Sequence, residues 1–285
     1  MTPTLAPIGN VLGLHDLAAL HRCSADGSLE LLYQPEVDLA TGAIVAMEGL
    51  LRWHHAEMGV LTPLSFLELA EDSGEIAAIG EWVLRQGADE AARWSGLPAP
   101  QRRLWLNVSV GQLSAPGFPD LVAAVVAAAG LPHGALGLEV SEASVRRLGA
   151  AAGPLLAELR DAGVALAVDD FSSWIATLGA IAALPVDAVK LGHRYVRGVG
   201  DHVGADGSGD RTVAAIIEQA HDHGMVVVAE GVETWGEAAR LTELGCDRAH
   251  GWLYASAQRA DRARWLLRSG TGWQGSCVPA ARAGS

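Results

Sequence analysis

Apolar runs rich in Val, Ile and Leu alternate with amphipathic stretches along most of the 285-residue chain. The runs predict β-strands, and the stretches with a period near 3.6 predict helices. Successive strands often begin about 20–40 residues apart, which is the spacing of strand–helix–strand crossovers in a mostly parallel sheet. The alternation therefore restricts the chain to the α/β class.

The predicted strands are Leu29–Pro35, Ala43–Trp53, Arg103–Val110, Leu136–Val140, Val164–Asp170, Ala188–Leu191 and Met225–Glu230, with a weak eighth strand near Arg248–Leu253. The predicted helices are Pro63–Asp72, Ile76–Trp94, Leu121–Gly130, Pro154–Ala162, Thr177–Ala183, Arg211–His223 and Trp235–Leu244.

The connection between the first two strands is too short for a parallel pair. Only about seven residues join Pro35 to Ala43, whereas a parallel crossover needs a dozen or more. We therefore predict a TIM-like (β/α)8 barrel in which strand 1 runs antiparallel to strand 2. The alternative is an open doubly wound sheet, but no strand–turn–helix carries GxGxxG. The glycines between Gly198 and Gly204 have the wrong spacing for a phosphate loop.

One barrel of about 250 residues accounts for most of the length. We expect an N-terminal extension over residues 1–13, the barrel over 14–269 and a flexible Gly-, Ser- and Ala-rich tail over 270–285. The three cysteines are far apart without a CxxC pair, which indicates a reducing compartment. Since neither a signal peptide nor an apolar membrane-length stretch is evident, we expect a cytoplasmic protein without a membrane span.

The charge balance excludes one class of partner. Twenty Lys and Arg face 33 Asp and Glu, for a formal net charge of −13. Nucleic-acid polymers require a positive surface, so we do not expect one as a partner. A small anionic ligand held through metal ions stays compatible with this charge. Four arginines on the last helix (Arg259, Arg262, Arg264 and Arg268) are read as a solvated face, with a partner contact as the alternative.

Polar residues close the predicted strands in chain order. They are Glu48, Asn107, Glu139, Asp169 with Asp170, Lys190 and Glu230. In parallel α/β barrels the carboxyl ends of the strands surround one mouth, which is where active sites lie. A single acidic residue at a strand end is usually a helix cap or a surface charge, but seven in order are hard to explain in that way.

Five carboxylates at one mouth repel each other and cannot all ionise without a counter-charge. Mg²⁺ or Mn²⁺ supplies that charge and prefers carboxylate and amide oxygens as ligands. The adjacent acids Asp169 and Asp170 suit two metal ions about 4 Å apart. The sequence thus predicts a two-metal site.

Composition singles out two of these residues. Lys190 is the one lysine among twenty basic residues, and Asn107 is one of two asparagines. Arg and Lys differ in shape, hydration and pKa behaviour, so a site that needs a compact ammonium explains the exception.

The motifs resemble the EAL-domain family. They are Gln34-Pro35, Glu48-Gly-Leu50-Leu-Arg52-Trp, Asn107-Val-Ser, Glu139-Val-Ser-Glu142, Asp169-Asp170-Phe, Lys190 and Ala-Glu230-Gly-Val-Glu233-Thr, in the family's order and spacing from about residue 14 to 269. The resemblance implies a cyclic-di-GMP phosphodiesterase, or a degenerate relative that binds the dinucleotide or a partner protein.

The resemblance also implies residue roles. Glu48, Asn107, Glu139 and Asp169 would hold one metal ion, and Asp169, Asp170 and Glu230 would surround the second. Glu230 would be the general base and Lys190 the catalytic cation. Arg52 would pair with a substrate phosphate, while Gln34 and Leu50 would contact the ligand. Glu142 and Glu233 would anchor the loop that follows Asp170.

The chain departs from the family pattern at four places. Gly49 replaces the alanine of the signature, and Ser172–Leu178 replaces a segment that normally carries two glycines. Gly192 stands where an acid is usual, and His250 stands where a glutamine is usual. Altered supporting residues typically lower metal affinity or activity.

We therefore expect hydrolysis of cyclic di-GMP to linear pGpG that is weak or conditional. The alternatives are a catalytically silent receptor for cyclic di-GMP and a protein-interaction module. A homodimer and a regulatory protein are the candidate macromolecular partners.

Overall fold

The structure is a computed structural model that describes residues 12, 16–94, 96–97, 102–171, 181, 183–197, 199 and 208–269. Its strands are β1 (Leu29–Asp38), β2 (Ile44–His55), β3 (Gly59–Leu61), β4 (Arg103–Val108), β5 (Leu136–Ser141), β6 (Ala165–Phe171), β7 (Ala188–Leu191), β8 (Val226–Ala229) and β9 (Arg248–Ala249).

Eight of the strands close into a barrel. The hydrogen-bonded order runs β1-β9-β8-β7-β6-β5-β4-β2, and pairing of β1 with β2 completes the ring. The strands from β2 to β9 around this ring are parallel neighbours, whereas β1 is antiparallel to both β2 and β9. This confirms the predicted barrel with one reversed strand, and it excludes the open doubly wound sheet.

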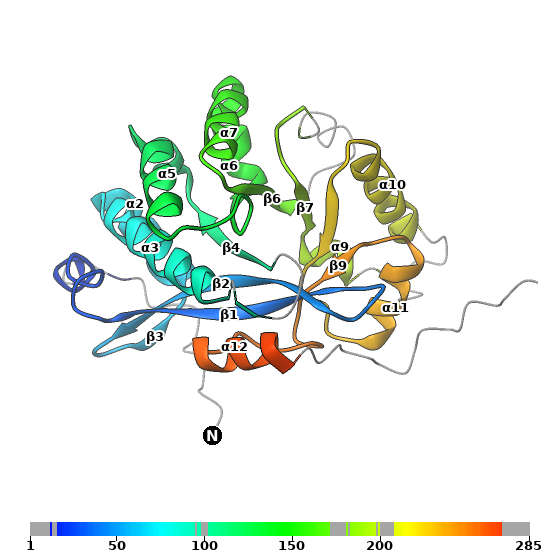
Figure 1. The fold of residues 1–285 in the computed structure, drawn as a ribbon, viewed down its shortest axis with the longest axis horizontal. Coiled ribbons are helices and arrows are strands. Elements are labelled where there is room, and N and C mark those ends of the chain that lie inside the picture. The colour runs from blue at the N-terminus through cyan, green and yellow to red at the C-terminus, as the bar shows by residue number, and fades with distance from the viewer. Residues whose placement is uncertain are drawn as a thin grey trace, which may run out of the picture.

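The helices lie on the outside of the barrel (Figure 1). They are α1 (Leu17–Leu20), α2 (Pro63–Ser73), α3 (Ile76–Trp94), α4 (Val110–Leu113), α5 (Phe118–Ala128), α6 (Glu142–Leu148), the 3-10 turn η1 (Gly149–Ala151), α7 (Ala152–Asp161), α9 (His193–Val196), α10 (Ser208–Asp222), α11 (Trp235–Glu243) and α12 (Ala260–Ser269). Among the described residues, no helix has the length and hydropathy that a membrane span requires.

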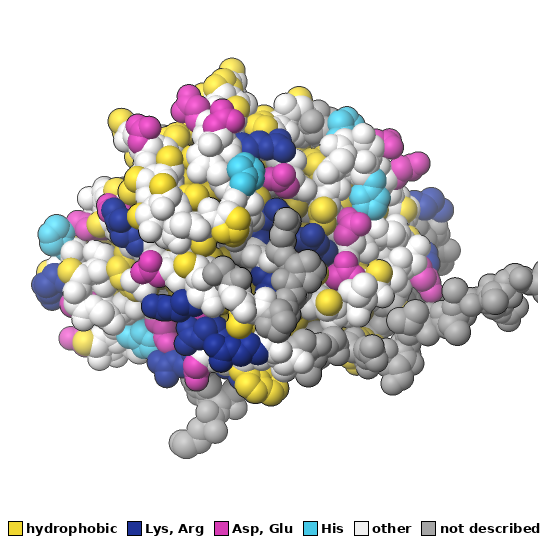
Figure 2. Space-filling model, in the orientation of Figure 1, with side chains coloured by type: hydrophobic (Ala, Val, Ile, Leu, Met, Phe, Trp, Pro, Cys, Tyr) yellow, Lys and Arg dark blue, Asp and Glu magenta, His cyan; other side chains and the backbone are white. Residues whose placement is uncertain are grey.

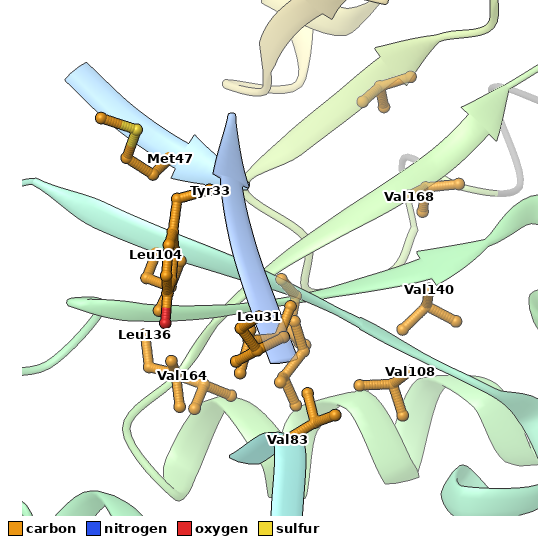
Figure 3. Packing of buried hydrophobic residues seen from close by; sticks show 14 of the residues in the cluster. Leu31, Tyr33, Met47, Val83, Leu104, Val108, Leu136, Val140, Val164 and Val168 are labelled. Atoms are coloured by element: carbon orange, nitrogen blue, oxygen red, sulfur yellow. The ribbon is translucent and has the colours of Figure 1, made fainter. Parts of the chain in front are cut away.

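A continuous apolar core fills the space between the strands and the helices. Figure 3 shows part of it, with Val83 of α3 below Leu31 of β1 and beside Val108 of β4. The apolar face of α3 follows from its spacing, because Ile76, Ile79 and Val83 recur every three or four residues and all are buried.

A large aromatic side chain packs inside the barrel. Trp105 of β4 is fully buried there among four alanines of β2, β6 and β7 (Ala46, Ala165, Ala167 and Ala188). A side-chain carbon at Gly137 of β5 would overlap the Trp105 ring. Small residues around one large residue fill the interior as a packed layer.

Apart from Ala188–Leu191, the predicted strands differ from the observed ones at one or both ends, and two of these differences are informative. The third predicted strand was extended to Val110, but β4 ends at Val108 because Ser109 caps α4 in a capping box with Gln112. The weak eighth strand was extended to Leu253, but β9 contains only Arg248 and Ala249. The hairpin strand β3 was not predicted, because its three residues are too few for a periodic signal.

Several sequence expectations lie outside the described residues. They concern the extension over 1–13 apart from Leu12, the segment Ser172–Leu178, most of the predicted helix Thr177–Ala183, most of the loop from Gly198 to Gly204, and the tail over 270–285.

Basic side chains gather over α12 (Figure 2). Arg259 pairs with Glu30 at 2.7 Å and Arg264 pairs with Glu90 at 2.7 Å, while Arg262 stacks 3.9 Å above the ring of Trp265. These contacts join α12 to β1 and α3. Arg259 and Arg264, which were predicted to be solvated, therefore hold the last helix against the barrel.

Candidate functional site

The polar residues predicted at the strand ends lie at one mouth of the barrel. Glu48 lies within β2, and Asn107, Glu139, Asp169 and Lys190 lie in β4, β5, β6 and β7. Glu230 follows β8 directly. The register places Asn107 opposite Glu139, because β4 and β5 are parallel and in step. The mouth is thus assembled from consecutive strands, as expected from the alternation of strands and helices.

Lys190 is at the centre of this group. Its Nζ lies 3.0 Å from Glu48 Oε2, 2.5 Å from Glu139 Oε1 and 3.5 Å from Glu230 Oε1, and the residue is 1% exposed. Burial alone would lower the pKa of Lys190, but the negative charges of Glu139 and Glu48 outweigh it and hold the pKa well above its usual range. The ammonium therefore stays charged inside the protein.

The negative charge of the buried Glu139 carboxylate is only partly balanced by Lys190. Within the part of the chain that the structure describes, neither of its buried oxygens accepts a well-oriented hydrogen bond, although Lys190 approaches one of them. Burial, and then repulsion from Glu48, raise the pKa of Glu139 well above its usual range. A buried carboxylate in this state requires a further cation or a proton.

Asp169 and Glu230 form a coupled pair. Their carboxyl groups share a hydrogen bond, and burial together with the Glu230 charge raises the pKa of Asp169 to about 7. Burial works against ionisation of Glu230 as well, but the hydrogen bond from His250 and the charge of Lys190 hold the pKa of Glu230 below its usual range. Where the pair holds one proton, that proton is therefore favoured on Asp169 over Glu230.

Asn107 supports the group through Glu48. Its Nδ2 donates a hydrogen bond to Glu48 Oε1 at 2.9 Å. The amide carbonyl oxygen of Asn107 is then available as a metal ligand. Burial raises the pKa of Glu48, yet the charges of Lys190 and His250 outweigh burial and lower it below its usual range.

His250 belongs to the same group, although sequence reasoning did not select it as a site residue. Its Nε2 lies 3.1 Å from Glu230 Oε1 and 3.6 Å from Glu48 Oε2, and the residue is 8% exposed. It was missed because the eighth predicted strand is weak and because the reasoning considered oxygen ligands. The available signal was its position directly after that strand, where the family pattern has glutamine.

Asp170 lies apart from the buried group. It is exposed and has a φ of 48°, the one positive φ of a non-glycine residue among those described. A side-chain carbon at Gly192 would lie 2.5 Å from Asp170 Oδ1, so the carboxylate occupies the space above that glycine. Burial and the charge of Glu230 raise the pKa of Asp170.

The residues predicted to contact a ligand lie on β1 and β2. Gln34 pairs with Glu48 across the two strands, and its Nε2 donates to the carbonyl oxygen of Ala255 at 3.0 Å. Leu50 and Arg52 are half-buried, and Arg52 Nη1 donates to the carbonyl oxygen of Leu51 at 2.7 Å. Burial lowers the pKa of Arg52.

The two residues predicted to anchor the loop after Asp170 lie at helix starts. Glu142 begins α6, is 2% exposed and lies 3.5 Å from Arg146 Nη1. Glu233 is exposed, lies 3.9 Å from Arg197 Nη2, and its backbone N–H donates to Glu237 at 2.8 Å. The loop itself lies outside the described residues.

The arrangement fits a divalent cation. Glu48, Glu230 and His250 offer three ligand atoms that all lie within 4.8 Å of one another. The carboxyl groups of Glu139 and Asp169 offer further oxygen ligands beside this group, and their raised pKa values mean that they release protons when an ion binds. Oxygen-rich sets of this kind bind hard or borderline divalent ions.

Comparison with known proteins identifies the family, because residues 17–257 match the EAL domain. The chain belongs to the EAL domain family. Its match covers every strand of the barrel and each residue predicted at the mouth.

Curated proteins similar to this chain include one from Mycobacterium and one from Pseudomonas. The uncharacterized protein Rv1357c of Mycobacterium tuberculosis is 35% identical over 249 residues, which are 87% of this chain and 81% of that protein. Cyclic di-GMP phosphodiesterase PA2567 of Pseudomonas aeruginosa is 32% identical over 239 residues, which are 84% of this chain and 40% of that protein. This EAL chain thus spans less than half of the latter.

Solved EAL structures share the architecture. The PaMucR phosphodiesterase, in complex with c-di-GMP, has 31% identity and a TM-score of 0.79 over 88% of this chain and 98% of its own. The EAL domain of Mycobacterium smegmatis DcpA has 33% identity and a TM-score of 0.70 over 85% of this chain and 98% of its own. Both likenesses support the barrel described above.

Proposed function

We propose that this protein is a metal-dependent phosphodiesterase that hydrolyses cyclic di-GMP to linear pGpG in second-messenger signalling. The carrying observation is the buried group around Lys190, in which Glu48, Glu139 and Glu230 all lie within 3.5 Å of one ammonium. Such a concentration of charge is costly to stability and typical of a catalytic site. The likeness to a phosphodiesterase solved with c-di-GMP supports the choice of substrate.

The proposed metal ligands are divided between two ions, Mg²⁺ or Mn²⁺. Glu48, Asn107, Glu139 and Asp169 would hold the first, and Asp169, Asp170 and Glu230 would surround the second. The buried oxygens of Glu139, which have Lys190 as a neighbour but no well-oriented donor among the described residues, support the first set. The exposed position of Asp170 makes the second set the more open of the two.

Bound divalent cations supply a nucleophile at neutral pH by acidifying water, and they neutralise phosphate charge. Glu230 would accept the proton of the attacking water at a carboxylate oxygen. Lys190 would stabilise the charge that develops on the phosphate. Burial holds its ammonium in place and reduces the screening of its charge by water.

The substrate would lie along β1 and β2. Arg52 would pair with a phosphate oxygen, for which a half-buried guanidinium is well suited. Gln34 and Leu50 would contact the remainder of the dinucleotide, and the pairing of Gln34 with Glu48 places that contact beside the carboxylates. Glu142 and Glu233 would hold the loop that follows Asp170.

Activity is expected to be weak or conditional. The hydrogen bond between His250 and Glu230 lowers the pKa of the proposed base, and a weaker base removes a proton less effectively. The departures at Gly49 and Gly192 alter the packing next to Glu48 and Asp170.

The test is hydrolysis of cyclic di-GMP by the purified protein with Mn²⁺ or Mg²⁺, with pGpG quantified by chromatography. Glu230→Gln should reduce turnover by at least ~100-fold, the usual contribution of a general base. Glu81→Gln is the matched control, because Glu81 is an exposed glutamate paired with Arg85, and it should leave turnover unchanged.

The second candidate is a catalytically silent receptor, which the hydrogen bond between His250 and Glu230 favours by engaging the proposed base. It predicts that calorimetry detects cyclic di-GMP binding, that Arg52→Ala weakens it, and that neither metal yields pGpG. Binding without turnover would contradict the enzyme. Absence of binding would contradict both candidates and favour the protein-interaction module.

A further inference from the structure

His250 brings a nitrogen donor to a group that otherwise offers oxygen. Its Nε2 lies 3.1 Å from Glu230 Oε1 and 3.6 Å from Glu48 Oε2. An ion bound at about 2.1 Å by two adjacent ligand atoms keeps those atoms about 3 Å apart. The imidazole therefore stands at the separation from both carboxylates that a shared ion requires.

The backbone fixes the imidazole in this place. The N–H of His250 donates to the carbonyl oxygen of Ala229 at 3.0 Å, and the carbonyl oxygen of His250 accepts from the N–H of Val232 at 3.0 Å. These bonds continue the pairing of β8 with β9 past the end of both strands, on either side of Glu230. The ligand atoms thus stand on rigid neighbouring elements, as a preorganised metal site needs.

Gly251 allows this close approach. A side-chain carbon there would overlap the backbone of Val232. The sequence His250-Gly251 therefore places the imidazole directly against the segment that carries Glu230.

An ion binds the lone pair of Nε2 only when the ring proton is on Nδ1, so the proton that Nε2 shares with Glu230 is released when the ion binds. Nδ1 of His250 is buried and has no hydrogen-bond partner among the residues that the structure describes. Its polar contacts are therefore concentrated on Nε2, which faces Glu230 and Glu48.

The lysine does not exclude an ion from this position. Lys190 approaches both proposed ligand oxygens, Glu48 Oε2 at 3.0 Å and Glu230 Oε1 at 3.5 Å, and each carboxylate oxygen has a second lone pair for an ion. Glu139 adds two buried oxygens without well-oriented donors among the described residues. One ammonium leaves this group with an excess of negative charge that a divalent ion balances.

We propose that His250 is a direct ligand of the second ion together with Glu230, that Glu48 lies between the two ions and contacts both, and that His250 makes this site selective for Mn²⁺ over Mg²⁺. Imidazole suits transition metals, whereas Mg²⁺ prefers oxygen ligands and retains its water. The inference rests on the proposed function only in that a divalent ion binds among these carboxylates, and it does not depend on turnover.

Pulsed electron paramagnetic resonance of the Mn²⁺-loaded full chain tests the ligand directly, because a coordinated imidazole gives a ¹⁴N coupling. The wild type should show the coupling, and His250→Gln should lose it. His193→Gln is the matched control, since His193 lies against Gly231 near the mouth but outside the three-ligand group, and it should retain the coupling.

Affinity provides a second measurement. His250→Gln should weaken Mn²⁺ binding by about tenfold or more, the range found when residues of a metal site are altered, and should change Mg²⁺ affinity little. Equal losses for the two metals would contradict the proposed selectivity.

The outcomes separate this inference from the proposed function. Mn²⁺ that binds without ¹⁴N coupling, or a coupling that persists in His250→Gln, overturns the ligand assignment even where pGpG is formed. A coupling that depends on His250 upholds the assignment even where the protein fails to hydrolyse cyclic di-GMP.

Discussion

The ammonium nitrogen of Lys190 lies 2.5 Å from Glu139 Oε1, and both residues are only 1% exposed. A buried pair of this kind is costly to break, because removal of one partner leaves the other charge uncompensated. Here the cation also faces Glu48 and Glu230, so one side chain balances three carboxylates.

Lys190→Met should therefore destabilise the metal-free protein by about 3–5 kcal/mol. Urea denaturation in the presence of a chelator measures the loss, and Mn²⁺ should recover part of it. Arg85→Met is the control, because its pairing with Glu81 is exposed and such pairs contribute little. An equal effect of the two substitutions would contradict the role of Lys190.

The pH dependence of stability follows from Asp169. Its pKa of about 7 in the folded protein exceeds the usual value near 4, so the protonated form is favoured by folding. The resulting stabilisation is complete below pH ~4 and is lost as the pH rises through about 7. The metal-free protein should thus lose about 1 kcal/mol of unfolding free energy from pH 6 to pH 8.

Asp169→Asn should flatten part of this dependence, and the raised pKa of Glu139 should leave a remainder in the same direction. Urea denaturation at several pH values with a chelator is the measurement. If the stability of the metal-free wild type rose from pH 6 to pH 8, the result would contradict the described protonation of Asp169 beside Glu230.

Leu106 lies between two glycines. A side-chain carbon at Gly49 would lie 2.7 Å from Leu106 Cδ2, and one at Gly87 would lie 2.6 Å from Leu106 Cδ1. Gly49→Ala, which restores the usual signature, should therefore overpack the core and destabilise the protein by about 1–3 kcal/mol.

Leu106→Val should relieve the clash in the double variant. A double-mutant cycle measured by thermal or urea denaturation should then give a favourable coupling between positions 49 and 106. Additive effects would show that Leu106 does not respond to residue 49.

Gly251 is the backbone support of His250. Gly251→Ala should displace the segment from Val232, because the overlap is with backbone atoms that cannot rotate away. The expected result is a lower melting temperature together with weaker Mn²⁺ binding. Gly153→Ala serves as the control, since a side-chain carbon there makes only an ordinary contact with Leu184 at 3.9 Å. If Gly251→Ala left the Mn²⁺ affinity unchanged, this result would contradict the proposal that His250 binds the metal.

The sequence predicted the barrel well because long apolar runs and long amphipathic helices carry strong periodic signals. The helices α4, α6 and α9 span only four to seven residues and were missed. Their starts depend on single capping residues such as Ser109 and Ser141, which a periodicity argument does not weigh.

The site was predictable in part. Polar residues at the ends of apolar strands stand out, and the structure brings Glu48, Glu139, Asp169, Lys190 and Glu230 together. Their assigned roles stay predictions. His250 was not selected, because β9 is too short to mark its own carboxyl end.

The reversal of β1 determines where the polypeptide enters the barrel. Leu29 pairs with Trp53 and Gln34 pairs with Glu48, so β1 starts on the side of the mouth and runs inward past the carboxylates. In an all-parallel barrel the first strand would enter from the opposite end. A mechanical pull on the chain ahead of Leu29 would consequently load the hydrogen bonds beside Arg52 first, so force from that direction reaches the rim of the barrel mouth before the rest of the barrel.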